Sequence, residues 1–362
     1  MARMARGVRV RAAAAAVLCS VCGCLDSPPA RVGGEDAGGR DAATFDANAL
    51  DGWTRRAPII VEGLGQTIDD VPVLVRLAPE VVSDLDLDDD LRDIRFVDGE
   101  TLLLLPHDIL APASDGTANL YVRLPLLPPD GITFDVYGGN PAASDAESPL
   151  EVWQGFSGVW HLDERNGGAF DDETGPHPAV LNGTASDVSG RVGNAVELKG
   201  SQNLEVTDHP GVSPPDAVTA EITIRPDQID SSDRYGISNG TFELQLCSAG
   251  GGEATFLVWD TESGGQAVVG ATAALAEWVY LAGTYDGTNL AIYQDGILKL
   301  SVDVSVELDD TSANLFVGKR VVGDVDEVRI SPVGRSSAWI QAQQRMFADD
   351  GLVTVGSVAD IP

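Results

Sequence analysis

The most regular stretch of the chain is Trp278-Val-Tyr-Leu-Ala-Gly-Thr-Tyr-Asp-Gly287, which continues into Leu290-Ala-Ile-Tyr-Gln-Asp-Gly296. Val279, Leu281, Gly283 and Tyr285 alternate along the segment with Tyr280, Ala282 and Thr284. In a β-strand two such alternating sets point to opposite faces of the sheet. Asp286-Gly287 and Asp295-Gly296 are typical of two-residue hairpin turns, because both residue types tolerate positive φ. The stretch therefore predicts a meander of consecutive hairpins, of the kind that builds one face of a β-sandwich.

Short strands are also predicted upstream of this meander. No helical stripe separates them, which favours an antiparallel sandwich over alternating strands and helices. One helix is predicted, over Arg335–Phe347. The predicted upstream strands are Pro58–Gly63, Val71–Leu77, Asp93–Val97, Leu120–Leu124 and Ile132–Tyr137.

The composition limits the possible partners. The 362 residues carry a formal net charge of −33, with 23 Lys and Arg against 56 Asp and Glu. A surface this acidic repels phosphate backbones and anionic lipid, so we expect no nucleic-acid partner. The length is that of roughly two domains.

The amino terminus has the pattern of an export signal. Residues 1–11 are basic, and Ala12–Leu18 form an apolar run too short to span a bilayer. Val21-Cys22-Gly23-Cys24 resembles a bacterial lipobox, in which the last Cys receives the lipid. We therefore predict a signal peptide over 1–23 and lipidation of Cys24, with an ordinary cleaved signal peptide as the alternative. By analogy with such lipoproteins, the absence of Asp after Cys24 favours the outer membrane or cell surface, with the lipid anchor as the one membrane contact.

Residues 24–51 are predicted to form a flexible acidic tether. They are rich in Gly, Ala, Asp and Pro and cannot bury enough apolar surface to fold. Once Cys24 is lipidated and the signal peptide is removed, Cys247 is the remaining thiol, which excludes an intramolecular disulfide. Its apolar, alternating context predicts a buried core residue.

Residues 52–149 contain four motifs that belong together. They are Ala57–Ile60, Val71–Leu77, Asp93–Phe96 and Tyr137–Asn140. The set resembles a bacterial extracellular domain of unknown function that commonly precedes laminin-G-like modules. It departs from that family at His107–Leu110, where the family usually has Glu-x-Trp. Because the family has no assigned catalytic residues, the resemblance implies architecture rather than chemistry.

Residues 150–358 carry a second set of motifs. They are Gly158–Glu164, Gly190–Leu198, Trp278–Gly287 and Gly323–Ile330. In this order they resemble a laminin-G-like, concanavalin A-type jelly roll. The predicted fold is therefore all-β, with a small antiparallel β-sandwich over 52–149 followed by a concanavalin A-like (laminin-G-like) jelly roll over 150–358.

The sequence does not support a catalytic strand. Asp324-Val-Asp326-Glu327 superficially resembles the Glu-x-Asp-x-x-Glu strand of glucanases with this fold. Retaining glycosidases need two carboxylates about 5–5.5 Å apart, which here requires acids four residues apart on one strand. The position four residues after Asp324 is Val328, so we predict no enzymatic activity.

Calcium is the predicted metal. Asp163, Asp172 and Asp326 fall where jelly rolls of this type place acidic ligands, so the resemblance implies one structural Ca²⁺. The alternative is that these acids are three solvated members of a set of 56. The acidic run Ser83–Asp90 fails as an EF-hand, because its sixth position is Asp89 instead of Gly, and is predicted to be a solvated loop.

Trp259 and Tyr235 are the predicted ligand-binding aromatics. Sugar binding needs an aromatic platform beside polar groups, and both residues have polar turns as neighbours. The alternative is a half-buried aromatic of the sandwich. His161, between Trp160 and Leu162, is predicted to be an interior histidine with satisfied hydrogen bonds.

These features predict an exported cell-surface lipoprotein whose lectin-like domain binds a glycan without catalysis. The first alternative is a structural or adhesion module that binds a cell-surface protein. The second is a glycoside hydrolase of the same fold.

Replacing the lipidated residue tests the anchor. If Cys24 carries the lipid, Cys24→Ala removes the attachment and the protein moves to the soluble fraction, as measured by membrane fractionation. Unchanged membrane retention of the variant would contradict the prediction.

Overall fold

The computed structural model describes residues 50–361, except 112, 114, 164, 231, 248–252, 261–263, 272–273, 310–311 and 349–350. The predicted signal peptide, Cys24 and most of the tether lie outside these residues. Cys247 belongs to a strand, but its side chain also lies outside the described part. Among the described residues, none of the helices has the length and apolar character needed to cross a membrane.

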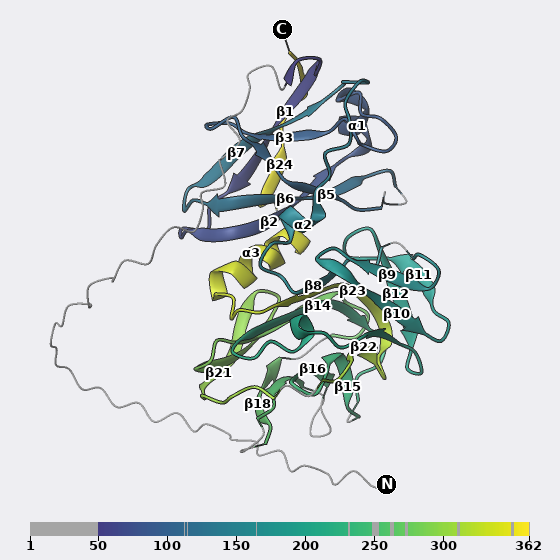
Figure 1. The fold of residues 1–362 in the computed structure, drawn as a ribbon, viewed down its shortest axis with the longest axis vertical. Helices are drawn as coiled ribbons and strands as arrows, with labels where there is room; N and C mark the ends of the chain where they lie inside the picture. Colours follow the sequence, from purple (N-terminus) through teal and green to yellow (C-terminus); the bar gives the residue numbers. More distant parts are fainter. Residues whose placement is uncertain are drawn as a thin grey trace, which may run out of the picture.

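The chain forms two β-sandwiches, one above the other in Figure 1. The upper, N-terminal sandwich packs a six-stranded sheet against a three-stranded sheet. The six-stranded sheet contains β24 (Val353–Val355), β1 (Arg55–Glu62), β7 (Gly131–Gly138), β3 (Arg95–Asp98) and β4 (Leu104–Leu105), and β25 (Ala359–Asp360) also pairs with β1. The three-stranded sheet contains β2 (Ile68–Leu77), β6 (Ala118–Leu127) and β5 (His107–Ile109), and α1 (Pro79–Asp84) follows β2.

The lower sandwich consists of two eight-stranded antiparallel sheets, which confirms the predicted all-β jelly roll. We call them the junction sheet, which faces the N-terminal sandwich, and the distal sheet. The junction sheet contains β11 (Ser186–Ser189), β12 (Asn194–Lys199), β23 (Val322–Ser331), β14 (Val218–Pro226), β19 (Val279–Tyr285), β20 (Asn289–Gln294) and β21 (Ile297–Asp303), with β8 (Gly158–Trp160) paired to β23. The distal sheet contains β18 (Gln266–Ala271), β17 (Ala254–Val258), β16 (Phe242–Cys247), β15 (Arg234–Ser238), β22 (Leu315–Lys319), β13 (Asn203–Val206), β10 (Gly175–Asn182) and β9 (Ala169–Asp172).

The meander predicted over residues 278–296 is present in the junction sheet. β19 pairs with β20 and β20 with β21, through turns at the two Asp-Gly pairs. Asp295 and Gly296 both have positive φ, 50° and 73°, as the mirror-image hairpin turn requires. Both predicted hairpins are present, but in the first turn Gly287 has a positive φ, of 92°, whereas Asp286 does not. The Asp286 side chain instead accepts from the amides of Thr288 and Asn289 at 2.8 and 2.7 Å.

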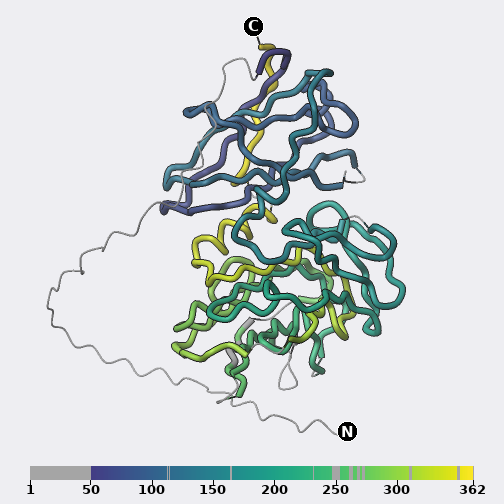
Figure 2. Tube along the Cα trace, viewed as in Figure 1, coloured from purple at the N-terminus to yellow at the C-terminus, as the bar shows by residue number. Residues whose placement is uncertain are grey.

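The end of the chain returns to the N-terminal sandwich. β24 and β25 pair with opposite ends of β1, so purple and yellow segments lie side by side at the top of Figure 2. Residues up to 358 were predicted to belong to the jelly roll. Strand pairing instead assigns Val353–Val355 to the first sandwich, because they complete the free edge of β1.

Two helices lie at the junction: α2 (Pro149–Val152) connects the sandwiches, and α3 (Ser337–Ala348) lies between them (Figure 1). A short 3-10 helix, η2 (Pro210–Val212), follows β13 and contributes Val212 to the core of the jelly roll. The predicted helix is confirmed to within two residues at each end. α3 buries Trp339, Ile340 and Phe347 in one apolar cluster with residues of the N-terminal sandwich and the outward side of the junction sheet. The two sandwiches therefore share a hydrophobic core across their junction.

Candidate functional site

The junction sheet buries polar side chains on the face that meets the N-terminal sandwich. Between β14 and β23 the register pairs Thr223 with Asp326 and Glu221 with Arg329. A step of two residues on β14 thus corresponds to three residues on β23, and the extra residue on β23 forms a β-bulge. Glu327 lies in the bulge with a φ of 48°, a conformation that non-glycine residues seldom adopt. A bulge re-aims side chains, and this one places Asp326, Glu327 and Arg329 together beneath the first sandwich.

Six buried side chains from both sandwiches meet at this bulge, and we call them the junction cluster. They are Asp108, Tyr121, Trp153, His161, Glu327 and Arg329. Asp108 comes from β5 and Tyr121 from β6 of the first sandwich, whereas Glu327 and Arg329 come from β23. The cluster therefore joins strands that are about 200 residues apart in sequence, and the Tyr121–Glu327 separation is 206 residues.

His161 bridges two carboxylates within the cluster. Its Nδ1 lies 2.9 Å from Glu327 Oε1, and its Nε2 lies 3.2 Å from Asp108 Oδ2. The ring also stacks on Tyr121, with 5.2 Å between centroids. Burial lowers the pKa of His161, but Glu327 and the hydrogen bonds to both acids outweigh it and raise the pKa well above its usual value. The residue is thus an interior imidazolium with both nitrogens engaged, as the prediction of a satisfied histidine required.

Arg329 completes the charge balance. Its Nη2 donates to Glu327 Oε2 at 2.5 Å and to the Tyr121 hydroxyl at 2.6 Å. The Tyr121 hydroxyl in turn donates to Glu327 Oε2 at 2.9 Å. Burial raises the pKa of Glu327, but the charges of His161 and Arg329 and their hydrogen bonds to this carboxylate outweigh that effect and lower the pKa to about 2. Two cations thus face two carboxylates, of Glu327 and Asp108, inside the protein.

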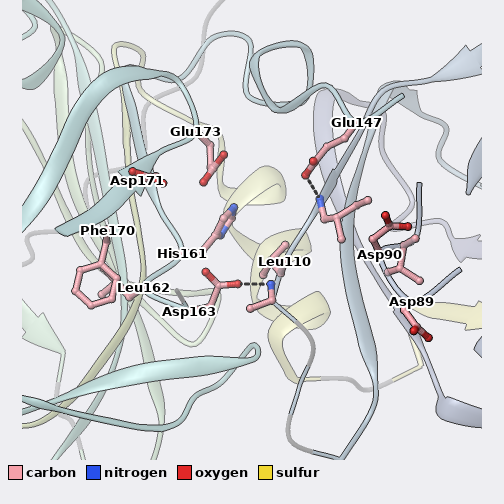
Figure 3. Close-up of a pocket in the computed structure, with 13 residues that line it drawn as sticks. Asp89, Asp90, Leu110, Glu147, His161, Leu162, Asp163, Phe170, Asp171 and Glu173 are labelled. Carbon is pink, nitrogen blue, oxygen red and sulfur yellow. Dashed lines mark hydrogen bonds between the residues drawn. The ribbon is translucent and has the colours of Figure 1, made fainter. Parts of the chain in front are cut away.

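An acidic cavity of about 270 Å³ opens beside the cluster. Figure 3 shows Asp163, Asp171 and Glu173 on the jelly-roll side and Asp89, Asp90 and Glu147 on the N-terminal side. We call it the acidic cavity. Leu110, Phe170 and the edge of His161 also line it. Its described lining residues include no lysine or arginine.

Two hydrogen bonds fix the walls of the acidic cavity. Asp163 Oδ2 accepts from the Ala111 amide at 2.7 Å, and Glu147 Oε1 accepts from the Ile109 amide at 2.9 Å. The first bond holds the Asp163 carboxylate, and the second the Glu147 carboxylate, against the backbone at the end of β5. The walls are therefore built from both the linker and the two sandwiches.

Burial among like charges perturbs the acids of this cavity. Burial and the nearby Asp108 raise the pKa of Glu173 to about 7. Burial also raises the pKa values of Asp163 and Glu147. The cavity can therefore accept hydrogen bonds from hydroxyl or ammonium groups, and near neutral pH Glu173 can also donate one.

The structure distributes the three predicted calcium ligands over different contacts. Asp163 lines the acidic cavity, whereas Asp172 Oδ1 accepts from the Val159 and Thr174 amides at 3.1 and 3.0 Å. Asp326 Oδ2 accepts from two amides of the β11–β12 turn. Within the described ranges no three His, Cys, Asp or Glu side chains are grouped so that they could hold a metal ion. As placed, the three acids do not converge, and calcium binding stays a prediction.

The predicted aromatic ligand residues lie away from the junction. Tyr235 is in β15 and Trp259 follows β17, both in the distal sheet and both half-buried. Neither lines the acidic cavity. A Cβ on Gly265 would lie 3.0 Å from the Trp259 ring, so this ring packs on a glycine of its own hairpin. Sugar stacking on the two aromatics stays a prediction.

Sequence reasoning missed several residues at the junction. Asp89 and Asp90 were assigned to a solvated loop; they are exposed, but they also form one rim of the acidic cavity. Asp108, Glu147 and Glu173 carry no local motif.

The spacing Gly236-Ile-Ser-Asn-Gly240 matches a serine-nucleophile motif, but it forms the β15–β16 hairpin rather than the strand–turn–helix that the motif needs.

Comparison with known proteins supports the jelly roll. Residues 198–341 match the Laminin_G_3 family model, described as the concanavalin A-like lectin/glucanases superfamily. No curated protein matches the chain. The match covers the larger part of the second sandwich, which confirms the predicted fold of that part.

Solved structures with a similar fold include domain 4 of AbnA, a GH43 extracellular arabinanase from Geobacillus stearothermophilus, in complex with arabinotriose. It is 16% identical, with a TM-score of 0.44, over 51% of this chain and 96% of that chain. The binding domain of Paraclostridial Mosquitocidal Protein 1 is 12% identical, with a TM-score of 0.44, over 53% and 52%. The botulinum neurotoxin serotype D ligand-binding domain in complex with N-acetylneuraminic acid is 14% identical, with a TM-score of 0.42, over 53% and 50%. The chain thus spans about half the length of these two toxin domains, and all three likenesses concern the fold alone.

Removing one acid from the cavity should stabilise the protein in a pH-dependent way. Burial raises the pKa of Glu173 from the ordinary 4.5 of a glutamate to about 7, so the unfolded chain releases this proton first and folding free energy is lost progressively as the pH rises from about 4.5 to 7. Glu173→Gln is therefore expected to raise the melting temperature by about 2–4 °C at pH 8 and to leave it nearly unchanged at about pH 4, below both pKa values.

The exposed Glu100→Gln serves as the matched control and should change the melting temperature at neither pH. An equal shift of Glu173→Gln at both pH values, measured by differential scanning calorimetry, would contradict the assigned electrostatics of the cavity.

Proposed function

We propose that this chain is a non-catalytic glycan-binding protein of the cell surface and that a sugar occupies the acidic cavity. The cavity itself carries the proposal. Its carboxylates are arranged to accept hydrogen bonds from several directions, and a pyranose ring presents hydroxyl donors around its whole edge. The lectin/glucanase family match in residues 198–341 supports the same class of ligand.

Export and anchoring complete the proposal. The basic and apolar amino terminus and the lipobox-like residues before Cys24 support attachment to a membrane from outside the cytoplasm. The net charge of −33 favours a neutral or hydroxyl-rich partner over nucleic acid. An adhesion module that binds a protein is the rival, because the end of a lysine or arginine side chain would also suit the acidic cavity.

Glycoside hydrolysis is a second candidate for one specific reason. Glu173, with a pKa of about 7, lies in one cavity with Asp163, and a protonated acid beside a carboxylate is the pairing that glycosidases use. The proposal of binding without turnover is separated from it by assaying any bound glycan for new reducing ends.

A glycan array tests the proposal. The full chain should bind a defined set of glycans, and the double substitution Asp171→Asn with Glu173→Gln should weaken that binding about 10-fold or more, since hydrogen bonds to charged groups contribute roughly 1.5–3 kcal/mol. Trp259→Ala tests the competing prediction of sugar stacking beside the distal sheet, and it leaves the affinity unchanged if the sugar occupies the acidic cavity. Absence of any bound glycan would refute the proposal, and loss of binding in Trp259→Ala alone would place the site on the distal sheet.

A further inference from the structure

β21 (Ile297–Asp303) is a free edge of the junction sheet. It pairs with β20 on one side, and no strand of the described residues pairs with its other side. Three large apolar side chains are exposed on this one strand: Ile297, Leu298 and Leu300 are 61%, 45% and 40% exposed. An unpaired, apolar edge of this kind is a template for the addition of another strand.

The other sheet edges differ from β21. β11, at the opposite edge of the junction sheet, is short and polar, and β9 of the distal sheet has four residues. β2 is a long edge strand of the first sandwich, but it is mostly buried, and α3 and β24 contact it. Among the edge strands whose side chains the structure describes, β21 is therefore the one that is both long and exposed.

The hydrogen-bond register shows which backbone groups of β21 face the free edge. The Val304 amide, just after the strand, donates to the Thr288 carbonyl at 2.9 Å. Alternate residues of an antiparallel strand point their backbone groups to opposite sides, so Val302 directs its N–H and C=O towards β20. The backbone groups of Ser301 and Asp303 therefore point away from β20, towards the free edge.

Two opposite charges flank this backbone. The register steps from Leu298 to Leu300 on β21 for one residue on β20, so Lys299 is the extra residue of a β-bulge and has no partner on β20. The Lys299 and Asp303 side chains are both exposed. Asp303 Oδ1 accepts from the side-chain amide of Asn289 at 3.1 Å, which holds the carboxylate beside the edge.

The segment Lys299-Leu-Ser-Val-Asp303 is complementary to itself. When two copies align antiparallel about Ser301, the lysine of each copy is opposite the aspartate of the other, and Leu300 is opposite Val302 of the second copy. The backbone groups that face the free edge then form the hydrogen-bonded pairs of the new ladder. Charge, apolar surface and backbone register thus agree on one alignment.

The lysine makes this edge selective. Lysine at a free edge normally discourages strand addition, because an arbitrary strand offers it no acid. Asp303 removes that penalty for one partner, a second β21, and it leaves the strand neutral in a chain whose net charge is −33. The occupant that fits the edge is therefore another copy of this chain.

We infer that β21 joins two copies of the chain into a two-fold symmetric dimer, in which the junction sheet continues from one copy into the other. Because the two-fold contact uses the same strand on both copies, the assembly closes at the dimer. β21 and β9 lie at opposite sides of the jelly roll in Figure 1, and β9 contributes to the wall of the acidic cavity. The inference does not depend on what that cavity binds.

Sedimentation equilibrium of the full chain tests the inference. The native chain should show a reversible monomer–dimer equilibrium. Lys299→Asp and Asp303→Lys should each weaken the dimer by about 10-fold or more, because the two-fold axis places two like-charge pairs in either interface. An equimolar mixture of the two variants should restore the native affinity, since each substituted position then faces the opposite charge.

Two further variants control for the fold and for charge in general. Ser301→Pro removes an amide that faces the free edge and not β20, so it should abolish the dimer while the far-UV circular dichroism stays native. Lys199→Asp makes the same charge change on β12, where the lysine side chain is 62% exposed, and should leave the dimer unchanged.

Three outcomes would overturn the inference. A native chain that stays monomeric up to its solubility limit would leave the edge to a strand of another protein. A dimer that survives both Lys299→Asp and Ser301→Pro would place the interface elsewhere. Open-ended assembly would contradict the two-fold contact. None of these results bears on the proposed function, which the glycan array tests separately.

Discussion

The arrangement of the two sandwiches depends on the buried hydrogen bonds that Tyr121 and Asp108 of the first sandwich make to the charged groups of the second, Glu327 and His161. The side chains of Glu327 and Arg329 are both inaccessible to solvent, so each needs the other, and Tyr121 and His161 occupy the remaining bonding positions of Glu327. Replacing both members of a buried ion pair by apolar groups often leaves the folding free energy unchanged, whereas removing one member destabilises the protein by about 3–5 kcal/mol. Glu327 and Arg329 keep each other as partners in any placement, because both belong to β23. The cluster selects one placement of the sandwiches because Tyr121 and Asp108 of the first sandwich meet Glu327 and His161 in this placement. The shared apolar core around α3 supplies the bulk of the contact area.

The β-bulge at Glu327 connects this constraint to the candidate sites. Without the extra residue, strict alternation would send either Asp326 or Arg329 into the jelly-roll core. With it, Asp326 holds the turn that carries Arg191, and Glu327 holds His161 at the edge of the acidic cavity. The acidic cavity takes walls from both sandwiches, so its shape is a consequence of the same buried charges.

Local patterns predicted what depends on local physics. The Asp-Gly hairpins, the five upstream strands and the helix near Arg335–Phe347 follow from turn chemistry and side-chain period, and all are present. The junction could not be predicted in this way. Asp108, Tyr121 and Glu327 meet only because two sandwiches pack together, and no spacing in the sequence encodes that contact. The return of Val353–Val355 to β1 was missed for the same reason, since a three-residue strand carries little periodic signal.

Calorimetric unfolding of the full chain tests most directly whether the junction cluster makes the two sandwiches one cooperative unit. The account predicts a single transition for the native protein and, in Glu327→Gln, a lower midpoint with two separated transitions, because the uncompensated Arg329 weakens the junction more than either sandwich. Two independent transitions in the native protein, with midpoints that Glu327→Gln leaves unchanged, would contradict it.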